Sequence, residues 1–430
     1  MTTDSRDTVF ALSSGAPPCG VAVIRISGPS SAAALRRLAG PLPDVRKASV
    51  RQLRDARGNW LDEALVLWFA GPRSATGEDC AEIHCHGGRA VVRAIERALE
   101  QDCGLRRAEA GEFTRRAFLN RRMDLLEAEA LGDMLAAETE LQRAVLASAA
   151  RGAASGEVSR WREAILSASA AVEQELDFSD DDEEGVAPPS VWRNAIGDVV
   201  GEIGAWLAVP SADRLRDGLR IVLAGPPNSG KSSLFNALLS EAAAIVSPIA
   251  GTTRDAIERP VAIEGVPFVL VDTAGLRSEG AEEIEAIGIA RAEAELARAD
   301  LVLWLGPEGD GPAGAIEVGS MIDLPDAARK APPALQVSAL SGEGLAALMA
   351  ALAEYGRERL PRPGQVAISR RQRELLGQAQ VALQAAGQEP DPLLAGEALR
   401  QARHAMDAML GTVATEDMLD TLFGRFCIGK

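Results

Sequence analysis

Cysteine, lysine, tyrosine and long apolar runs are all scarce in this chain of 430 residues. The five cysteines are too few for a disulfide framework, which indicates a reducing compartment. No apolar run approaches the roughly 18–20 residues that a membrane-spanning helix needs. Acids stand at Asp4 and Asp7, where a signal peptide would begin its apolar stretch. We therefore expect a cytoplasmic protein with no membrane segment.

Positive charge is also scarce, and it is unevenly placed. The formal net charge of −17 argues against a protein that wraps nucleic acid with its whole surface. Residues 1–122 nevertheless hold 19 Lys and Arg against 14 Asp and Glu, so this segment is locally basic. The lysines are Lys47, Lys231, Lys330 and Lys430. Nearly all basic residues of this chain are arginines. We therefore expect each of the four lysines to occupy a position where arginine cannot replace it.

The apolar pattern divides the chain into four segments. Residues 1–118 mix strand and helix patterns, and residues 119–212 are helical. Residues 213–357 alternate strand and helix in the rhythm of a parallel sheet, and residues 358–430 return to helix. We expect a multidomain α/β plus α protein, with one α/β domain inserted between the two halves of a helical domain.

One motif carries clear chemistry. Residues 225–232, Gly-Pro-Pro-Asn-Ser-Gly-Lys-Ser, fit the phosphate-binding pattern G-x-x-x-x-G-K-[ST] between a strand run and a helical pattern. Its glycines let backbone N–H groups turn inward around phosphates. Lys231 reaches the terminal phosphates, and the Ser232 hydroxyl can ligate Mg²⁺. The motif predicts a nucleotide-hydrolysing domain.

Further segments follow in the order of a GTPase switch. Thr252 and Thr253 lie in a loop where a hydroxyl can close on Mg²⁺. Residues 272–275, Asp-Thr-Ala-Gly, end the next buried strand, and residues 338–340, Ser-Ala-Leu, follow the last strand as a base-contacting loop does. Leu276 follows directly after the Asp-Thr-Ala-Gly segment, where Ras-type enzymes have the glutamine that orients water, so that glutamine is absent here.

Asn228 offers an alternative route to hydrolysis. Its side-chain carbonyl can hold a monovalent cation beside the β–γ bridge, where K⁺ would neutralise developing charge as an arginine finger does. Alternatively, Asn228 satisfies its own loop backbone.

Seven short motifs are spread between Gly20 and Lys430, and the match that they mark runs from about Asp7 to the C-terminus. They occupy residues 20–28 (GVAVIRISG), 76–79 (TGED), 84–88 (HCHGG), 111–120 (GEFTRRAFLN), 251–255 (GTTRD), 272–277 (DTAGLR) and 426–430 (FCIGK). Together they resemble the tRNA uridine-modification GTPases of the MnmE (TrmE) family.

The resemblance implies a domain plan and an activity. Residues 1–118 would form a homodimerising domain that binds 5-formyl-tetrahydrofolate, residues 119–212 and 358–430 a discontinuous helical domain, and residues 213–357 an inserted Ras-like P-loop G domain. Members of the family hydrolyse GTP with K⁺ stimulation. With the flavoprotein MnmG (GidA), in a heterotetramer, they add a carboxymethylaminomethyl group to C5 of the wobble uridine of certain tRNAs, using a one-carbon unit from the folate.

The resemblance also assigns roles to single positions. Folate contacts fall on Arg25, Glu82, Arg122 and Lys430; the family usually has lysine where this chain has Arg122, and Arg25 and Glu82 have the alternative of pairing with each other. Mg²⁺ falls to Ser232 and Thr253, and K⁺ to Asn228, Ser247, Ile249 and Thr252. Catalytic candidates are Lys231, Glu285 as the water-orienting carboxylate (with Glu282 and Glu283 as rivals) and Cys427, which is alternatively a packed small residue. The positions expected to contact GTP are Asn228, Ser229, Gly230, Lys231, Ser232, Ser233, Ser247, Pro248, Ile249, Ala250, Gly251, Thr252, Thr253, Asp272, Thr273, Ala274, Gly275, Asp323, Ser338, Ala339 and Leu340.

One departure concerns the base-reading motif Asn-Lys-x-Asp. It is replaced by Ser-Met-Ile-Asp at residues 320–323, which keeps Asp323 as an acceptor for guanine N1 and N2 but loses the packing lysine. The fourteen residues 306–319 are too few for both a helix and a strand, so we expect a trimmed G domain. Weaker nucleotide binding should follow.

Two other interpretations are weaker. Cys80, His84 and His86 are residue types that bind zinc, and alternation along a strand places all three on one face. The family resemblance implies no metal there. A ribosome-assembly or regulatory GTPase without tRNA chemistry usually adds a domain rich in Lys and Arg, whereas the flanking segments here are acidic overall and end in Cys-Ile-Gly-Lys.

Overall fold

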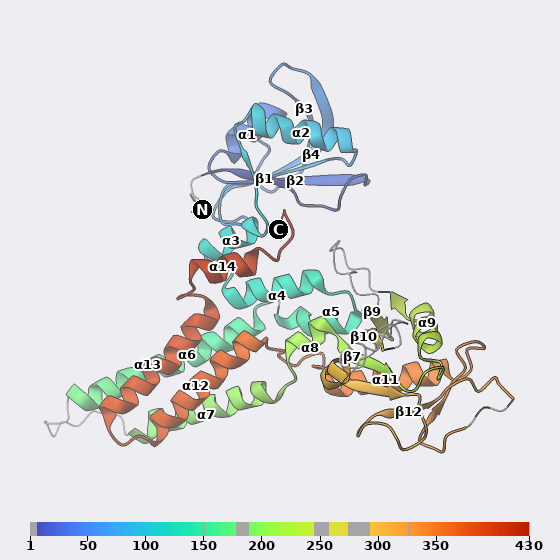
Figure 1. Ribbon diagram of the computed structural model, residues 1–430. Coiled ribbons are helices and arrows are strands. Elements are labelled where there is room, and N and C mark those ends of the chain that lie inside the picture. The colour runs from blue at the N-terminus through green and yellow to red at the C-terminus, as the bar shows by residue number, and fades with distance from the viewer. Residues whose placement is uncertain are drawn as a thin grey trace, which may run out of the picture. The chain divides into compact units, whose positions relative to one another are not determined.

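The computed structural model describes residues 7–149, 151–177, 189–244, 258–273, 293–325, 327 and 329–429. The chain forms two compact units. The N-terminal unit consists of residues 1–132 together with the C-terminal residues 407–430, and the second unit consists of residues 133–406. Figure 1 shows the elements of each unit. The three boundaries between the four segments expected from the sequence remain predictions.

The N-terminal unit contains a six-stranded sheet in the order β3-β4-β5-β2-β1-β6. Two helices pack on it and cover a core that includes Ile24, Ile83, Leu35 and Ile95, all fully buried. The strands are β1 (Val9–Leu12), β2 (Val21–Ser27), β3 (Ser49–Arg54), β4 (Trp60–Phe69), β5 (Cys80–His86) and β6 (Arg106–Arg107), and the helices are α1 (Ser31–Ala39) and α2 (Arg89–Gln101).

A buried ionic network joins distant parts of this unit. Arg116, 5% exposed, lies on α3 (Glu112–Leu119) and donates to Glu112 Oε1 at 2.8 Å, Asp7 Oδ1 at 2.5 Å and Glu78 Oε2 at 3.2 Å. Arg106 donates to Glu112 and to Asp7 at 2.7 and 2.9 Å. Burial raises the pKa of Glu112, but hydrogen bonds from Arg106, the Glu109 N–H and Arg116 outweigh it and hold that pKa below its usual range.

The C-terminal segment packs onto the same unit. Phe426 is buried beside Phe423 of α14 (Glu416–Phe423) and against α4 (Leu125–Ala136). Beyond it, Ile428 forms an isolated β-bridge with Ala110. Gly429 has φ 97°, and a Cβ there would lie 2.1 Å from the Leu12 carbonyl oxygen on β1. Only glycine fits this approach, so the tail is held directly on the sheet.

The second unit begins and ends with helices. Helix α7 packs against both α6 and α12, and Trp161, fully buried on α6, lies 4.6 Å from the ring of Trp206. Ser369 and Gln372 form a reciprocal capping box at the start of α12. The helices are α5 (Glu140–Ala149), α6 (Ala153–Asp177), α7 (Pro189–Ala208), α8 (Ala212–Asp217), α12 (Arg370–Gln388) and α13 (Pro392–Leu410).

The chain between α8 and α12 forms a seven-stranded sheet in the order β13-β12-β11-β7-β10-β9-β8. β7 is central and parallel to both β10 and β11, while β9 and β10 form the antiparallel hairpin that the turn at Glu264 and Gly265 predicts. The elements are β7 (Leu219–Ala224), α9 (Lys231–Glu241), β8 (Ala243–Ala244), β9 (Glu258–Ile263), β10 (Val266–Asp272), β11 (Leu301–Trp304), β12 (Ile316–Gly319), β13 (Leu335–Gln336) and α11 (Leu345–Arg359).

The connection from β11 to β12 is short. Residues 305–315 run between these parallel strands without a helix, as the spacing in the sequence predicts. Parallel neighbours are usually joined through a crossover helix, so this edge of the sheet is reduced. Within the described ranges, none of the helices has the length and apolar character needed to cross a bilayer.

The ionic network around Arg116 should make the stability of the N-terminal unit depend on pH. The pKa values of Glu112 and Asp7 are both lowered by their arginine partners against the effect of burial. A carboxyl with a lower pKa in the folded state stabilises the fold above its unfolded pKa, and this contribution is lost as pH falls through the folded value. We expect the unit to lose stability as pH falls below about 4.

Replacing Arg116 tests the network directly. Arg116→Met should lower the free energy of unfolding by about 3–5 kcal/mol at pH 7, because it removes the buried cation shared by Glu112, Glu78 and Asp7. The difference from wild type should shrink as pH falls below about 4. Urea titrations followed by hydrogen exchange of β1 and α3 measure it, with Arg107→Met, at a half-exposed arginine, as a control expected to cost about 1 kcal/mol or less. A pH-independent effect of Arg116→Met would contradict the prediction.

Candidate nucleotide-binding site

The loop between β7 and α9 has the backbone conformation of a phosphate cradle. Gly225 (φ 149°), Asn228 (φ 61°) and Gly230 (φ 88°) all adopt positive φ angles. A Cβ on Gly225 would lie 3.0 Å from the Gly306 nitrogen, so the loop passes tightly against the chain beyond β11. The N-terminus of α9 follows at Lys231, and the positive end of the helix dipole favours an anion there.

Lys231 and Ser232 lie at the centre of this loop. The Lys231 side chain is buried, and its ammonium donates to the carbonyl oxygens of Gly225 at 3.1 Å and Pro226 at 2.7 Å. The Ser232 hydroxyl donates to Asp272 Oδ2 at 2.7 Å. A hydroxyl and a carboxylate at one point offer the oxygen ligands that Mg²⁺ prefers.

The pairing of β10 with β7 explains why Asp272 reaches the loop. Asp272 lies opposite Leu223 in the parallel register, one residue before the end of β7. The Thr273 hydroxyl is buried and donates to the Leu223 carbonyl at 2.7 Å, which fixes the end of β10 to β7. The other switch positions expected from the sequence fall outside the described residues: Ser247, Pro248, Ile249, Ala250, Gly251, Thr252, Thr253, Ala274, Gly275, Glu282, Glu283 and Glu285.

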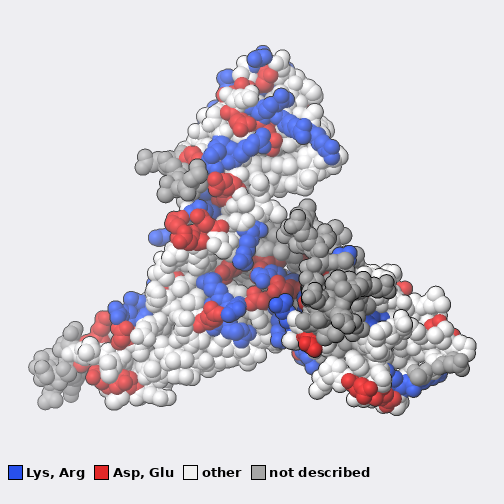
Figure 2. All heavy atoms as spheres, viewed as in Figure 1, with Lys and Arg blue, Asp and Glu red and all other residues white. Residues whose placement is uncertain are grey.

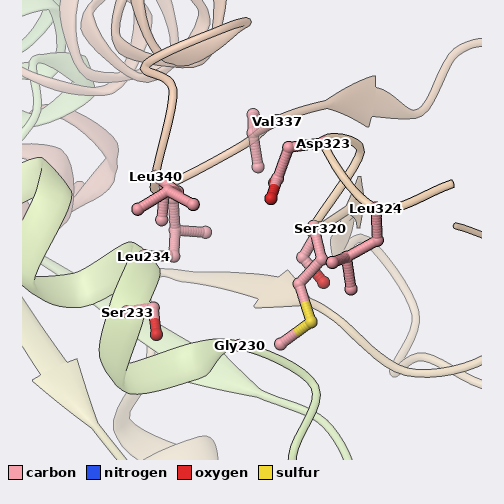
Figure 3. A pocket seen from close by; sticks show the side chains of 10 residues that line it. Gly230, Ser233, Leu234, Ser320, Asp323, Leu324, Val337 and Leu340 are labelled. Atoms are coloured by element: carbon pink, nitrogen blue, oxygen red, sulfur yellow. The ribbon is translucent and has the colours of Figure 1, made fainter.

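A pocket of about 180 Å³ lies beside the loop. Figure 3 shows the Asp323 carboxylate directed into the space between Leu234 and Leu340 on one side and Ser320 on the other. The Ser338 hydroxyl is fully buried and donates to Asp323 Oδ1 at 2.6 Å. Ala339 and Leu340 also line the pocket, so the structure brings the two expected base-contacting segments, 320–323 and 338–340, together.

Two residues of the altered motif have contacts that sequence reasoning missed. The Ser320 hydroxyl donates to the Ser229 carbonyl at 2.6 Å, which ties the base segment to the phosphate loop. Met321 has φ 59°, and its Cε lies 3.0 Å from where a Cβ on Gly230 would stand. The sequence did hold a signal for these contacts, namely Ser-Met in place of Asn-Lys at residues 320 and 321. With that replacement, any contact from this motif to the phosphate loop must come from shorter, uncharged side chains.

The positions expected to bind folate lie in the N-terminal unit. Arg25 and Glu82 are opposite each other on β2 and β5, and the guanidinium donates to Glu82 Oε1 at 2.9 and 3.1 Å, so the alternative pairing is present. The Arg25 guanidinium lies 5.7 Å from the centre of the Phe113 ring. Arg122 is exposed, and its Cγ lies over Gly77.

The remaining expected positions of this unit lie near the C-terminus. Cys427 is exposed and free, and Lys430 falls outside the described residues. Cys80 and Cys85 are buried, and His84 and His86 contact Glu82 and Asp62 respectively. In the described part of the chain, no group of three or more His, Cys, Asp or Glu residues is placed to hold a metal ion.

A glycine-rich loop between a central parallel strand and a helix, with a serine–carboxylate pair beside it, defines a P-loop nucleotide-binding domain. Residues 8–122 match the family model of the GTP-binding protein TrmE N-terminus, and residues 125–427 match that of the MnmE helical domain. The chain belongs to the MnmE family of tRNA modification GTPases.

Relatives match over nearly the whole chain. The tRNA modification GTPase MnmE of Erythrobacter litoralis is 57% identical over 424 residues, covering 99% of this chain and 100% of the relative. The same-named protein of Novosphingobium aromaticivorans is 54% identical, with the same coverage. Among solved structures, the G domain of the T. maritima FeoB iron transporter is 26% identical and covers 32% of this chain and 98% of that chain; its TM-score of 0.23 is too low to support an argument about fold.

The pocket predicts a guanine preference that depends on Asp323. Losing one charge-assisted hydrogen bond to the base costs about 1.5–3 kcal/mol, or roughly ten- to a hundredfold in affinity. Asp323→Asn should therefore erase most of the preference for GTP over ATP. Ser338→Ala should weaken GTP binding by about 1 kcal/mol, because the carboxylate loses the hydroxyl that positions it.

Fluorescence titrations with labelled GTP and ATP measure these effects. Ser341→Ala is the matched control, because that exposed serine lies three residues away and does not contact Asp323. Equal affinity of the unmutated chain for ATP and GTP would show that the pocket does not select guanine.

Proposed function

We propose that this protein hydrolyses GTP and, with the flavoprotein MnmG (GidA) in a heterotetramer, adds a carboxymethylaminomethyl group to C5 of the wobble uridine of certain tRNAs. The observation that carries the proposal is a full-length relationship to tRNA modification GTPases together with an intact phosphate loop. The one-carbon unit would come from 5-formyl-tetrahydrofolate. Because its substrate would be tRNA, the protein would act in the cytoplasm.

In the G domain, each described residue has a task in this reaction. The N–H groups of the loop and the ammonium of Lys231 would hold the β- and γ-phosphates. Ser232 would ligate Mg²⁺ with Thr253, while Asp272 accepts the Ser232 hydrogen bond and orients that hydroxyl. The metal supplies charge stabilisation for phosphoryl transfer. The buried Ser229 hydroxyl makes no hydrogen bond in the described structure, so the loop keeps a polar group available beside the phosphates.

K⁺ would complete the charge stabilisation. The proposed ligands are Asn228, Ser247, Ile249 and Thr252, with Glu285 orienting the attacking water. Asn228 supports this assignment because its side chain is exposed and its backbone has the αL conformation of a loop apex. The carboxamide is therefore not buried in the loop's own packing.

K⁺ dependence gives the sharpest test of this step. GTP turnover by the wild-type protein should be faster in K⁺ than in Na⁺, and Asn228→Ala should abolish the difference while nucleotide still binds. Steady-state phosphate release in the two salts, at matched ionic strength, measures it. Ser240→Ala, at an exposed serine near the end of α9 that bonds the Asn236 carbonyl, is the control. Equal wild-type rates in both salts would refute a K⁺ site.

The folate site would lie where the C-terminal tail meets the sheet. Gly429 approaches Leu12, and Leu12 immediately follows Ala11, the cross-strand partner of Arg25. Gly429, the last described residue of the tail, therefore lies one residue along β1 from the strand partner of Arg25. The Ser13 hydroxyl beside Gly429 is buried and makes no hydrogen bond with the described residues, which leaves a polar group for a ligand.

These groups suit the chemistry of a formyl-tetrahydrofolate. Arg25, Arg122 and Lys430 would neutralise the two carboxylates of the glutamate tail, and Glu82 would accept from the pterin edge. Cys427 would lie near the reacting group. Two copies of the chain would pair through the N-terminal unit.

Removing the tail should separate the two activities. Deleting residues 428–430 should leave GTP hydrolysis intact, because the phosphate loop lies in the other unit, while folate binding weakens and wobble uridine modification is lost. Calorimetric titration with the folate and nucleoside analysis of tRNA from a complemented deletion strain measure both effects. Lys231→Ala, which should lose hydrolysis but keep folate binding, is the converse control.

Each outcome distinguishes the proposals. Unchanged folate affinity after truncation would exclude the tail from that site. Normal wobble uridines in the deletion strain would refute the proposed tRNA chemistry and favour a regulatory GTPase. Co-purification of the full chain with the flavoprotein tests the partnership.

A further inference from the structure

One face of the N-terminal unit carries a cluster of exposed arginines. Helix α2 presents Arg89, Arg93 and Arg97 at four-residue spacing, so they form a stripe along one side of the helix. Helix α1, which packs on the same sheet, adds the exposed Arg36 and Arg37. We call these five residues the arginine face. Figure 2 shows Lys and Arg side chains gathered over the part of this unit where Figure 1 draws α2.

The charge of the arginine face is not compensated within the protein. In the part of the chain that the structure describes, none of its five guanidinium groups forms an ion pair. The two carboxylates on these helices, Glu96 and Glu100, lie 3.1 and 3.9 Å from the guanidinium of Arg107 instead. Arg89 and Arg97 donate only to backbone carbonyls, at 3.2 and 3.3 Å. The face therefore keeps its full charge on a protein of net charge −17.

The arginine face stands on a rigid base. The opposite sides of the two helices are buried in the core of the sheet through Leu35, Leu38, Val92, Ile95 and Leu99. Helix positions hold charged groups at set spacings, about 6 Å for four residues. A repeating polyanion can be matched by such an array without ordering a loop.

The composition of the face identifies its partner. The large apolar residues that are exposed in the described structure include none from α1 or α2. A protein interface is centred on buried aromatic or apolar anchors, and an interfacial membrane helix needs an apolar face. Arginine without such anchors matches a phosphate backbone, which it contacts through forked, charge-assisted hydrogen bonds.

We propose that the arginine face binds the phosphate backbone of tRNA. The inference rests on the proposed function and adds to it the surface that would hold the substrate. Helices α1 and α2 contain no aromatic residue that could stack on a base. The face would therefore contact phosphates and position the RNA without reading its sequence. The acidic remainder of the chain would repel RNA and so restrict it to this surface.

The salt dependence of tRNA binding tests the proposal. The variant Arg89→Gln/Arg93→Gln/Arg97→Gln should bind tRNA more weakly, and the slope of log affinity against log salt should fall by about two to three, since each lost phosphate contact contributes roughly 0.7–0.9. Filter binding of unmodified tRNA to the full-length protein measures this slope between roughly 50 and 200 mM KCl. GTP hydrolysis should stay unchanged, because the variant leaves the nucleotide site intact.

A control variant removes the same charge elsewhere. Arg143→Gln/Arg370→Gln/Arg400→Gln replaces three exposed helical arginines of the other unit, each paired with a glutamate three or four residues away. It should leave the slope unchanged. Equal losses in the two variants would mean that net charge alone acts, and would overturn the proposal.

Failure of this inference is distinguishable from failure of the proposed function. If wild type binds tRNA and restores wobble modification while the arginine-face variant keeps the full slope, only the arginine face is refuted. If wild type neither binds tRNA nor restores modification, both fall. Loss of flavoprotein binding with unchanged tRNA affinity would reassign the face to a protein partner and overturn the proposal.

Discussion

The parallel pairing of β7 with β10 and β11 is the constraint on which the nucleotide site depends. Because β7 is central, the loop that follows it opens at the carboxyl edge of the sheet, where Asp272 also ends β10. The Thr273 hydroxyl bonded to Leu223 holds that register, and the Ser232–Asp272 hydrogen bond follows from it. A one-residue slip would direct the Asp272 side chain to the other face of the sheet and separate this pair.

The N-terminal unit depends instead on buried charge. Several motif residues that mark the family, Glu78, Glu112 and Arg116, form the ionic network beneath the sheet. Their role in this structure is to join β1, the loop before β5 and α3. These residues of the motifs at 76–79 and 111–120 therefore have a structural role in the fold.

The base pocket shows how a reduced G domain retains its contacts. Ser320 ties the base segment to the loop through one hydroxyl, and Met321 packs over Gly230 where a lysine is absent. Asp323 keeps its orientation because Ser338, from the segment after β13, donates to it. The short connection from β11 to β12 removes a helix from the edge of the sheet without removing any of these contacts.

The sequence by itself determined the elements whose cause is local. The phosphate loop depends on glycines at positive φ, the β9–β10 hairpin on its two-residue turn, and the helices on their apolar spacing, so short segments were enough to predict them. Tertiary structure alone decided the contacts between distant residues: Arg116 with Asp7, Ser338 with Asp323, and Gly429 with Leu12. Their cause is the meeting of strands and helices far apart in the chain, and a side chain's type does not specify which distant partner the fold will bring to it.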